Sequence, residues 1–227
     1  MIDLRERSLE PEILDDPAVP DHVRERCYLD LERTHHWLGN HRLLIRRIAS
    51  DPEPVSRVLD IGCGHGNLLR EVRRKLHVDV IGVDLVPPAR VTDVPIRRAD
   101  AVRDPLPDAD IALSVIMAHH LSPAEVQSLI RNAGRSCRRL LLLDLVRHPV
   151  PLALFRAFIA PFVNPINVSD GIRSLERAYK PNELADIVRD ALSGTGATFR
   201  HEVALFKIRQ LVDIRFQPHS GSTSARE

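Results

Sequence analysis

Residues 57–67 read RVLDIGCGHGN, an apolar run that ends in a carboxylate and leads into three glycines at alternate positions. A strand that feeds a glycine turn and then a helix presents backbone N–H groups and lets a ligand approach the backbone closely. The dinucleotide fingerprint is Gly-x-Gly-x-x-Gly, but Asn67 stands where its third glycine belongs, and the actual third glycine is Gly66. Asp60, just before the loop, would repel a pyrophosphate and favour a cationic ligand.

Apolar runs alternate with helical patterns along the rest of the chain. The patterns predict parallel strands over 57–61, 78–84, 94–100, 108–116 and 138–146, helices over about 65–76, 122–133 and 180–194, and two antiparallel closing strands within 197–216. Strand and helix in alternation with short loops indicate a parallel sheet with helices on both faces. We therefore predict an α/β fold, a Rossmann-like, doubly wound, mostly parallel seven-stranded sheet with an N-terminal helical cap.

Two further carboxylates fall at the ends of predicted strands. Asp84 ends the second strand, at the distance of about 20 residues at which an acidic side chain binds ribose hydroxyls. Asp100 follows the third strand. Together with Asp60 they suit a ligand that has a ribose, an exocyclic amine and an ammonium group. S-adenosylmethionine has all three groups and a sulfonium cation as well.

Four segments carry a resemblance to a known family. VLDIGCGHGN, VIGVDL, RADA and DIALSVIMAHHL, in this order and spacing, resemble the four cofactor-facing motifs of class I S-adenosylmethionine-dependent methyltransferases, in the branch that acts on small molecules in bacteria. The similarity covers about residues 55–145. One departure is VPPARVTDV, which replaces the helix that usually follows the second strand.

The resemblance implies S-adenosylmethionine as cofactor, S-adenosylhomocysteine as product, and a set of contact residues. Along the chain these face the methionine part, then the ribose, then the adenine, and finally the methionine part again. The implied contacts are Asp60, Gly62, Cys63, Gly64, Asp84, Leu85, Asp100, Ala101, Ser114 and Val115. Asp84 would take both ribose hydroxyls, whereas Cys63 is also readily explained as a small buried filler.

The resemblance also divides the chain. Residues 1–54 form an N-terminal arm and helical cap, 55–216 the methyltransferase domain, and 217–227 a tail predicted to be disordered. Residues 149–180 are an apolar insertion, which in this family roofs the acceptor site. Its aromatic side chains, and those near Trp37, either line an acceptor pocket or pack helices together. The candidate lining residues are Tyr28, His35, His36, Trp37 and Arg173.

Methyl transfer to oxygen is a displacement at the sulfonium and requires the acceptor to lose a proton. A positioned histidine that accepts this proton supplies about 10²–10⁴-fold. His119 and His120 lie just past the fourth strand, so we predict one of them as the general base, with His119 the first choice. The alternative is that one of them packs against or caps the next helix.

Charge and composition restrict the partners. Lys and Arg total 32 and Asp and Glu total 31 in 227 residues, a balance that lacks the basic footprint of nucleic-acid binding. The element by which DNA amino-methyltransferases hold a flipped base is also missing, since SVIM follows in its place. Three distant cysteines, a polar start and no long apolar run predict a cytoplasmic protein with no membrane span. We predict no metal site, because adjacent histidine pairs are poor chelators on one helix.

The sequence thus favours O-methylation of a small, largely apolar acceptor. The segments SDGIRSLERAYKPNEL and HHWLGNHR resemble elements of bacterial small-molecule methyltransferases, and this resemblance implies a polyketide-like or quinone-like acceptor. Two other functions stay open: a catalytically idle S-adenosylmethionine-binding accessory subunit, and a protein or RNA methyltransferase. A homodimer that buries the apolar insertion is also compatible with the pattern.

Overall fold

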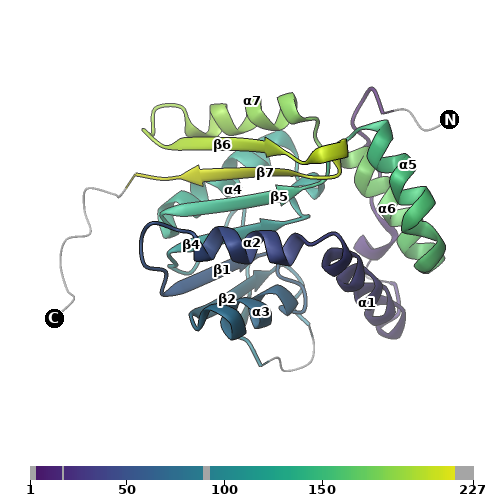
Figure 1. Ribbon diagram of the computed structural model, residues 1–227, viewed down its shortest axis with the longest axis horizontal. Helices are drawn as coiled ribbons and strands as arrows, with labels where there is room; N and C mark the ends of the chain where they lie inside the picture. Colours follow the sequence, from purple (N-terminus) through teal and green to yellow (C-terminus); the bar gives the residue numbers. More distant parts are fainter. Residues whose placement is uncertain (1–3, 17, 89–92, 218–227) are drawn as a thin grey trace.

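The computed structural model describes residues 4–16, 18–88 and 93–217, built around one seven-stranded sheet (Figure 1). The strands lie in the order β3-β2-β1-β4-β5-β7-β6, and only β7 runs antiparallel to its neighbours. Their bounds are β1 Arg57–Ile61, β2 Asp79–Asp84, β3 Ile96–Arg98, β4 Ile111–Val115, β5 Arg139–Asp144, β6 Thr198–Val203 and β7 Gln210–Arg215. The predicted Rossmann-like fold class is confirmed.

Seven α-helices accompany the sheet within the described residues. They are α1 Asp21–Trp37, α2 Asn40–Ala49, α3 Asn67–Leu76, α4 Pro123–Ser136, α5 Pro149–Phe158, α6 Pro165–Arg177 and α7 Pro181–Leu192. Four 3-10 turns complete the list: η1 Ile13–Asp15, η2 Ala118–His120, η3 Ala160–Phe162 and η4 Leu205–Lys207. The helical pattern over 21–50 is two helices, because Gly39 between them takes a φ of +67° that ends α1.

Alternate residues of each strand face opposite layers. In β5, Leu140 and Leu142 join the core formed with α4 and α7, whereas Leu141 and Leu143 join the core formed with α2 and α3. All six residues of β5 are buried. This pattern is expected of a central strand covered on both faces, and it explains the uninterrupted leucine run.

The remaining helices gather at one end of the sheet. Figure 1 shows α1, α5 and α6 together beyond the ends of the strands, at the edge where the parallel strands finish. The N-terminal arm, residues 4–16, runs between them without regular structure apart from η1. The carboxylate of Asp170 in α6 anchors it by accepting hydrogen bonds from the backbone N–H groups of Ile13 and Leu14, at 2.7 and 3.0 Å.

Two sequence predictions fall on parts of the chain that the structure does not describe. Residues 218–227 of the predicted tail 217–227 lie outside the described residues, and so do residues 89–92 of the VPPARVTDV departure. Among the helices that the structure describes, none combines the length and the apolar character needed to cross a membrane.

Candidate active site

The glycine loop between β1 and α3 is shaped by three left-handed residues, since Gly62, Gly64 and Gly66 have φ values of +73°, +50° and +74°. A Cβ on Gly66 would lie 2.6 Å from Cγ2 of Val94, so this glycine is needed for packing. A Cβ on Gly64 would meet nothing within 4 Å. The loop therefore leaves an open cradle beside Gly64, as a site for a bound nucleotide requires.

Two of the predicted carboxylates flank this cradle. Asp84 accepts hydrogen bonds from Gly64 N–H at 2.8 Å and from Val86 N–H at 2.9 Å, which fixes it beside the loop. Asp60 is buried at the end of β1. Its burial, together with the nearby charge of Asp84, raises the pKa of the Asp60 carboxyl to about 8. A cationic group bound here would stabilise the ionised form.

A cavity of about 300 Å³ begins at the glycine loop and extends below the N-terminal arm. It brings together seven of the predicted site residues: Asp60, Gly62, Cys63, Gly64, Val115, His119 and His120. The other five do not line it: Asp84, Leu85, Asp100, Ala101 and Ser114. Of these, Leu85 is 59% exposed, and Ser114 is buried with no partner for its hydroxyl.

The backbone is strained where β4 enters this cavity. Ile116 has a φ of +51°, although its branched side chain is unfavourable in that region. Its N–H donates to the carbonyl of Leu143 at 2.7 Å, and its side chain lines the cavity. Strain of this kind is concentrated at functional sites, where the surrounding structure holds it in place.

His119 is held rigidly at the far end of the cavity. Its Nδ1 lies 2.8 Å from one carboxylate oxygen of Asp144, and its backbone N–H donates to the other oxygen at 2.8 Å. Burial opposes charge on the ring, but Asp144 and Glu12 outweigh it and raise the pKa of His119 to about 9. At neutral pH the ring therefore already carries its second proton. The general-base function predicted for His119 therefore requires this proton to leave the ring first.

The N-terminal arm supplies residues that sequence reasoning missed. Oε1 of Glu12 lies 3.5 Å from Nε2 of His119 and 3.7 Å from Nε2 of His120. Ser174 of α6 donates its hydroxyl to the same oxygen at 2.6 Å. Nothing in an irregular, polar arm marks Glu12 in the sequence. Asp144, in contrast, ends an apolar strand as Asp60 and Asp84 do, and that signal was available.

The predicted pocket aromatics have mixed positions. Tyr28 and His35 line the cavity, and the Tyr28 ring lies 4.7 Å from the ring of His65. His36 and Trp37 point to solvent. Arg173 donates to the carbonyl of Pro11 at 2.8 Å and so holds the arm.

Within the insertion, helix packing accounts for two aromatic side chains. Phe155 fills the space above Gly171, where a Cβ would lie 2.4 Å from its ring. Tyr179 is buried and donates its hydroxyl to the carbonyl of Leu121 at 2.6 Å. Phe158 and Phe162, in contrast, are exposed.

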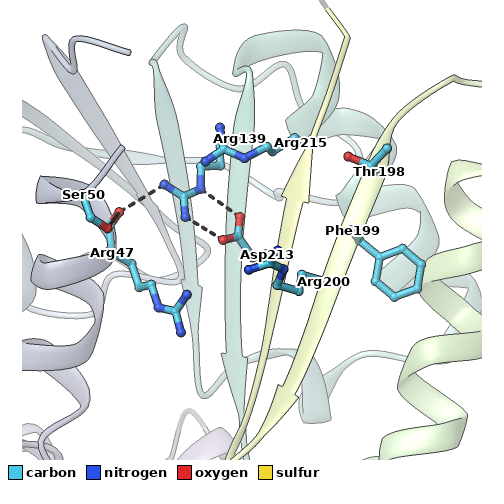
Figure 2. A pocket seen from close by; sticks show the side chains of 8 residues that line it. All are labelled: Arg47, Ser50, Arg139, Thr198, Phe199, Arg200, Asp213 and Arg215. Carbon is cyan, nitrogen blue, oxygen red and sulfur yellow. Dashed lines mark hydrogen bonds and ion pairs between the residues drawn. The ribbon is translucent and has the colours of Figure 1, made fainter. Parts of the chain in front are cut away.

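A second hollow, of about 470 Å³, lies at the opposite end of β5, where Arg47, Arg139 and Arg215 meet (Figure 2). Arg139 is only 3% exposed. It binds Asp213 through Nε and Nη2 at 2.8 and 2.6 Å, and Asp51 through Nη1 at 2.6 Å. This hollow is far from the glycine loop. The charge of Arg139 at its centre is neutralised by Asp213 and Asp51, so we assign this group of residues a structural role.

Comparisons with known proteins find sequence similarity in the central part of the chain. Residues 58–139 match a family model described as a methyltransferase domain. An indolepyruvate C-methyltransferase of Streptomyces griseus is 34% identical over 112 residues, which cover 41% of this chain and 34% of that protein. The match thus spans about a third of the length of this curated relative.

Solved structures extend the fold match to most of the chain. The plantazolicin methyltransferase BpumL in complex with S-adenosylhomocysteine has a TM-score of 0.68 at 11% identity and covers 88% of this chain and 92% of its own. Human N-acetylserotonin methyltransferase in complex with S-adenosylmethionine has a TM-score of 0.58 at 15% identity, over 86% and 56%. Magnesium protoporphyrin IX methyltransferase of Synechocystis PCC 6803 has a TM-score of 0.53 at 16% identity, over 90% and 91%.

The sheet order, the antiparallel β7 and the glycine cradle after β1 define a nucleotide-binding domain of the Rossmann-like class. Within that class, residues 58–139 match the model of a methyltransferase domain, and the curated relative is a methyltransferase, so this part of the chain is similar to class I S-adenosylmethionine-dependent methyltransferases.

Proposed function

We propose that the protein transfers the methyl group of S-adenosylmethionine to an oxygen atom of a small, largely apolar acceptor. The observation that carries this proposal is the cavity of about 300 Å³, whose lining joins the glycine loop to the histidines after β4. Its volume is at the low end for small-molecule sites, which are about 300–1,000 Å³. A protein or RNA acceptor would need an open groove instead.

The residues at the loop suit the cofactor. The cradle beside Gly64 leaves room for a ligand against the backbone, and Asp60 offers a negative charge to the ammonium group and the sulfonium. Asp84, fixed by the N–H of Gly64, is proposed to bind the ribose hydroxyls. Asp100 and Ala101 are proposed to contact the adenine, and Leu85 to cover its face.

The acceptor would lie in the rest of the cavity. Its apolar body fits among Leu14, Leu31 and Ile116, and a phenol or enol of polyketide-like or quinone-like type has the required combination of ring and hydroxyl. We place the hydroxyl against the polar end formed by Glu12, His119 and His120. Because His119 is already protonated, His120 takes over the proposed part of general base in the metal-free protein.

The test is transfer of label. The purified protein is incubated with methyl-labelled S-adenosylmethionine and either a panel of phenols and 2-oxo acids or an extract of bacterial metabolites, and products are identified by mass spectrometry. We expect label on oxygen in an organic-soluble product. Label on carbon would correct the methylated atom, and label in protein or RNA would overturn the acceptor class. Cofactor binding without any transfer would favour the idle accessory subunit.

Two further predictions remain proposals. The exposed side chains of Trp37 and Phe162, whose ring centroids lie 6.4 Å apart, form an apolar surface at the edge of the cap. A homodimer through this surface is testable by light scattering. A cytoplasmic location is likewise a prediction from sequence composition, testable by fractionation of the source cells.

A further inference from the structure

Two adjacent histidines and a glutamate from a distant part of the sequence bring one donor atom each close together. The three donor atoms, contributed by Glu12, His119 and His120, all lie within 4.8 Å of one another. Glu12 comes from the N-terminal arm, and the two histidines from η2. Because η2 is a single 3-10 turn and the third group comes from elsewhere, the objection to adjacent histidines on one long helix does not apply.

The distances suit a shared cation better than direct ion pairs. A charge-assisted hydrogen bond between nitrogen and oxygen is about 2.7–2.9 Å long, whereas Oε1 of Glu12 lies 3.5 Å and 3.7 Å from the two Nε2 atoms. Ligand atoms about 2.0–2.1 Å from a tetrahedral metal ion stand about 3.4 Å apart. The observed separations are close to this value.

Each of the two histidines has a carboxylate on its outer side, and Glu12 has a hydroxyl donor on the oxygen that faces them. Nδ1 of His119 lies 2.8 Å from Asp144, and Nδ1 of His120 lies 3.5 Å from Asp15. Both rings are thereby oriented with Nε2 toward Glu12, whose carboxylate in turn accepts from Ser174. Metal-binding histidines almost always give their other N–H to a carboxylate or carbonyl, and ligating carboxylates are hydrogen-bonded in turn.

We propose that Glu12, His119 and His120 form a binding site for a divalent transition-metal ion of the Zn²⁺ type, open on the side of the cavity. Two imidazoles and one carboxylate are a donor set that suits such ions. Three protein ligands leave a fourth position for water or for an oxygen of the acceptor.

This inference rests on the proposed function for its chemistry. The acceptor hydroxyl would occupy the open position, where the metal ion lowers its pKa, and its proton would leave to bulk water. The resulting oxyanion attacks the methyl carbon, the O–C bond forms as the S–C bond breaks, and the electron pair returns to sulfur. The sulfonium becomes the neutral thioether of S-adenosylhomocysteine, and the metal ion is unchanged. The metal-bound oxygen thereby replaces His120 as general base.

The site is tested by metal binding to the full-length protein, independently of activity. Protein stripped with a chelator and dialysed is titrated with Co²⁺, followed by visible absorption and calorimetry. We expect one bound ion per chain, with Glu12→Gln and His120→Gln each weakening it about a hundredfold, since even outer-shell partners are worth about 10–100-fold. Glu10→Gln in the same arm and His22→Gln on α1, both exposed, are matched controls and should bind Co²⁺ as the wild type does.

Binding of S-adenosylhomocysteine checks that each variant is folded, since none of the four changes touches the glycine loop. Absence of Co²⁺ binding by the wild type, or affinity in both Glu12→Gln and His120→Gln equal to that of the wild type, would overturn the metal site and leave the cluster as an ion-pair group that holds the arm. Methyl transfer that persists after metal stripping would overturn the metal's part in catalysis and retain the proposed function. Specific Co²⁺ binding without methyl transfer to any acceptor would overturn the proposed function and retain the metal site.

Discussion

At the scale of single residues, the site depends on carboxylates placed at strand ends. Asp84 and Asp144 are the last residues of β2 and β5, and Asp60 is the last but one of β1, so the sheet brings their charges to one edge. Their local surroundings then separate their functions. Asp84 is fixed by two backbone N–H groups, Asp144 is paired with His119, and Asp60 is buried where its ionised form is unfavourable.

Replacement of Asp84 tests the proposed ribose contact. Asp84→Ala removes an acceptor of charge-assisted hydrogen bonds, so it should weaken S-adenosylhomocysteine binding by at least about 1.5 kcal/mol, or roughly tenfold. Asp79→Ala at the exposed start of β2 is the matched control and should bind normally. Calorimetric titration measures both. An unchanged affinity in Asp84→Ala would remove this residue from the cofactor site.

Asp60 predicts a pH dependence of stability. Its pKa is about 8 in the folded, ligand-free protein, against about 3.9 in an unfolded chain. The folded state therefore holds a proton that the unfolded state has lost, so the stability of the free protein falls as pH rises from about 4 to about 8. In Asp60→Asn the share of this fall in stability that comes from residue 60 should disappear. Thermal unfolding of both proteins at pH 6 and pH 8 is the measurement, and an identical pH response would contradict the raised pKa.

Cofactor binding should release the same proton. An ammonium group beside Asp60 favours the carboxylate, so at pH 6.5 S-adenosylhomocysteine binding is expected to liberate up to one proton, and affinity should rise between pH 6 and pH 8. The binding enthalpy measured in buffers of different ionisation enthalpy gives the proton count. Asp60→Asn should abolish the release, and an equal release in the variant would assign the proton to another group.

At the scale of elements, α4 is the helix whose start the sequence specifies most fully. Ser122 accepts from Glu125 N–H at 3.4 Å, Glu125 accepts from Ser122 N–H at 2.8 Å, and Pro123 takes the first helical position. These contacts form a capping box, which the spacing of Ser122 and Glu125 in the sequence favours. A capping box can be inferred from sequence because all of its hydrogen-bond partners lie within one helical turn and it needs no distant contact.

Removal of this cap should reduce stability without affecting the site. Ser122→Ala is expected to cost about 1 kcal/mol of unfolding free energy, because the N–H of Glu125 loses its acceptor. Ser128→Ala is the matched control: it lies on the same helix, is half-buried, and donates its hydroxyl to the carbonyl of Ala124. Its effect should be near zero, since alanine has the higher helix propensity. Urea unfolding measures both, and equal losses would argue against the cap.

At the scale of the whole molecule, the N-terminal arm completes the cavity. Its anchor is Asp170, which accepts from Ile13 and Leu14 at 2.7 and 3.0 Å. Arg7 adds hydrogen bonds to the carbonyls of His119 and Leu121, at 2.6 and 2.8 Å. The arm thus ties α6 to the turn after β4, and it places Glu12 over both histidines.

Loss of the anchor should release the arm. In Asp170→Ala the two N–H groups lose their acceptor, and limited proteolysis should cleave the arm at least several times faster than in the wild type. S-adenosylhomocysteine affinity should stay the same, because the glycine loop makes no contact with Asp170. Asp190→Ala on the exposed face of α7 is the control. Unchanged proteolysis in Asp170→Ala would show that other contacts suffice to hold the arm.

The sequence by itself determined the sheet, the glycine loop and the carboxylates beside it. Local sequence patterns predict these features: apolar runs of strand length, glycines where φ is positive, and acidic residues at strand ends. Helix starts shifted only where backbone geometry intervened, as at Asn67, which begins α3 after the left-handed Gly66.

Only the tertiary structure decided what surrounds His119 and His120. Glu12 is separated from them by more than a hundred residues, and an irregular arm carries no periodicity that predicts where it docks. The pKa of His119 follows from Asp144 and Glu12 together, so its protonation could not be inferred from MAHHL. Electrostatic interactions depend on distance in space, and folding sets those distances for residues that the chain keeps far apart.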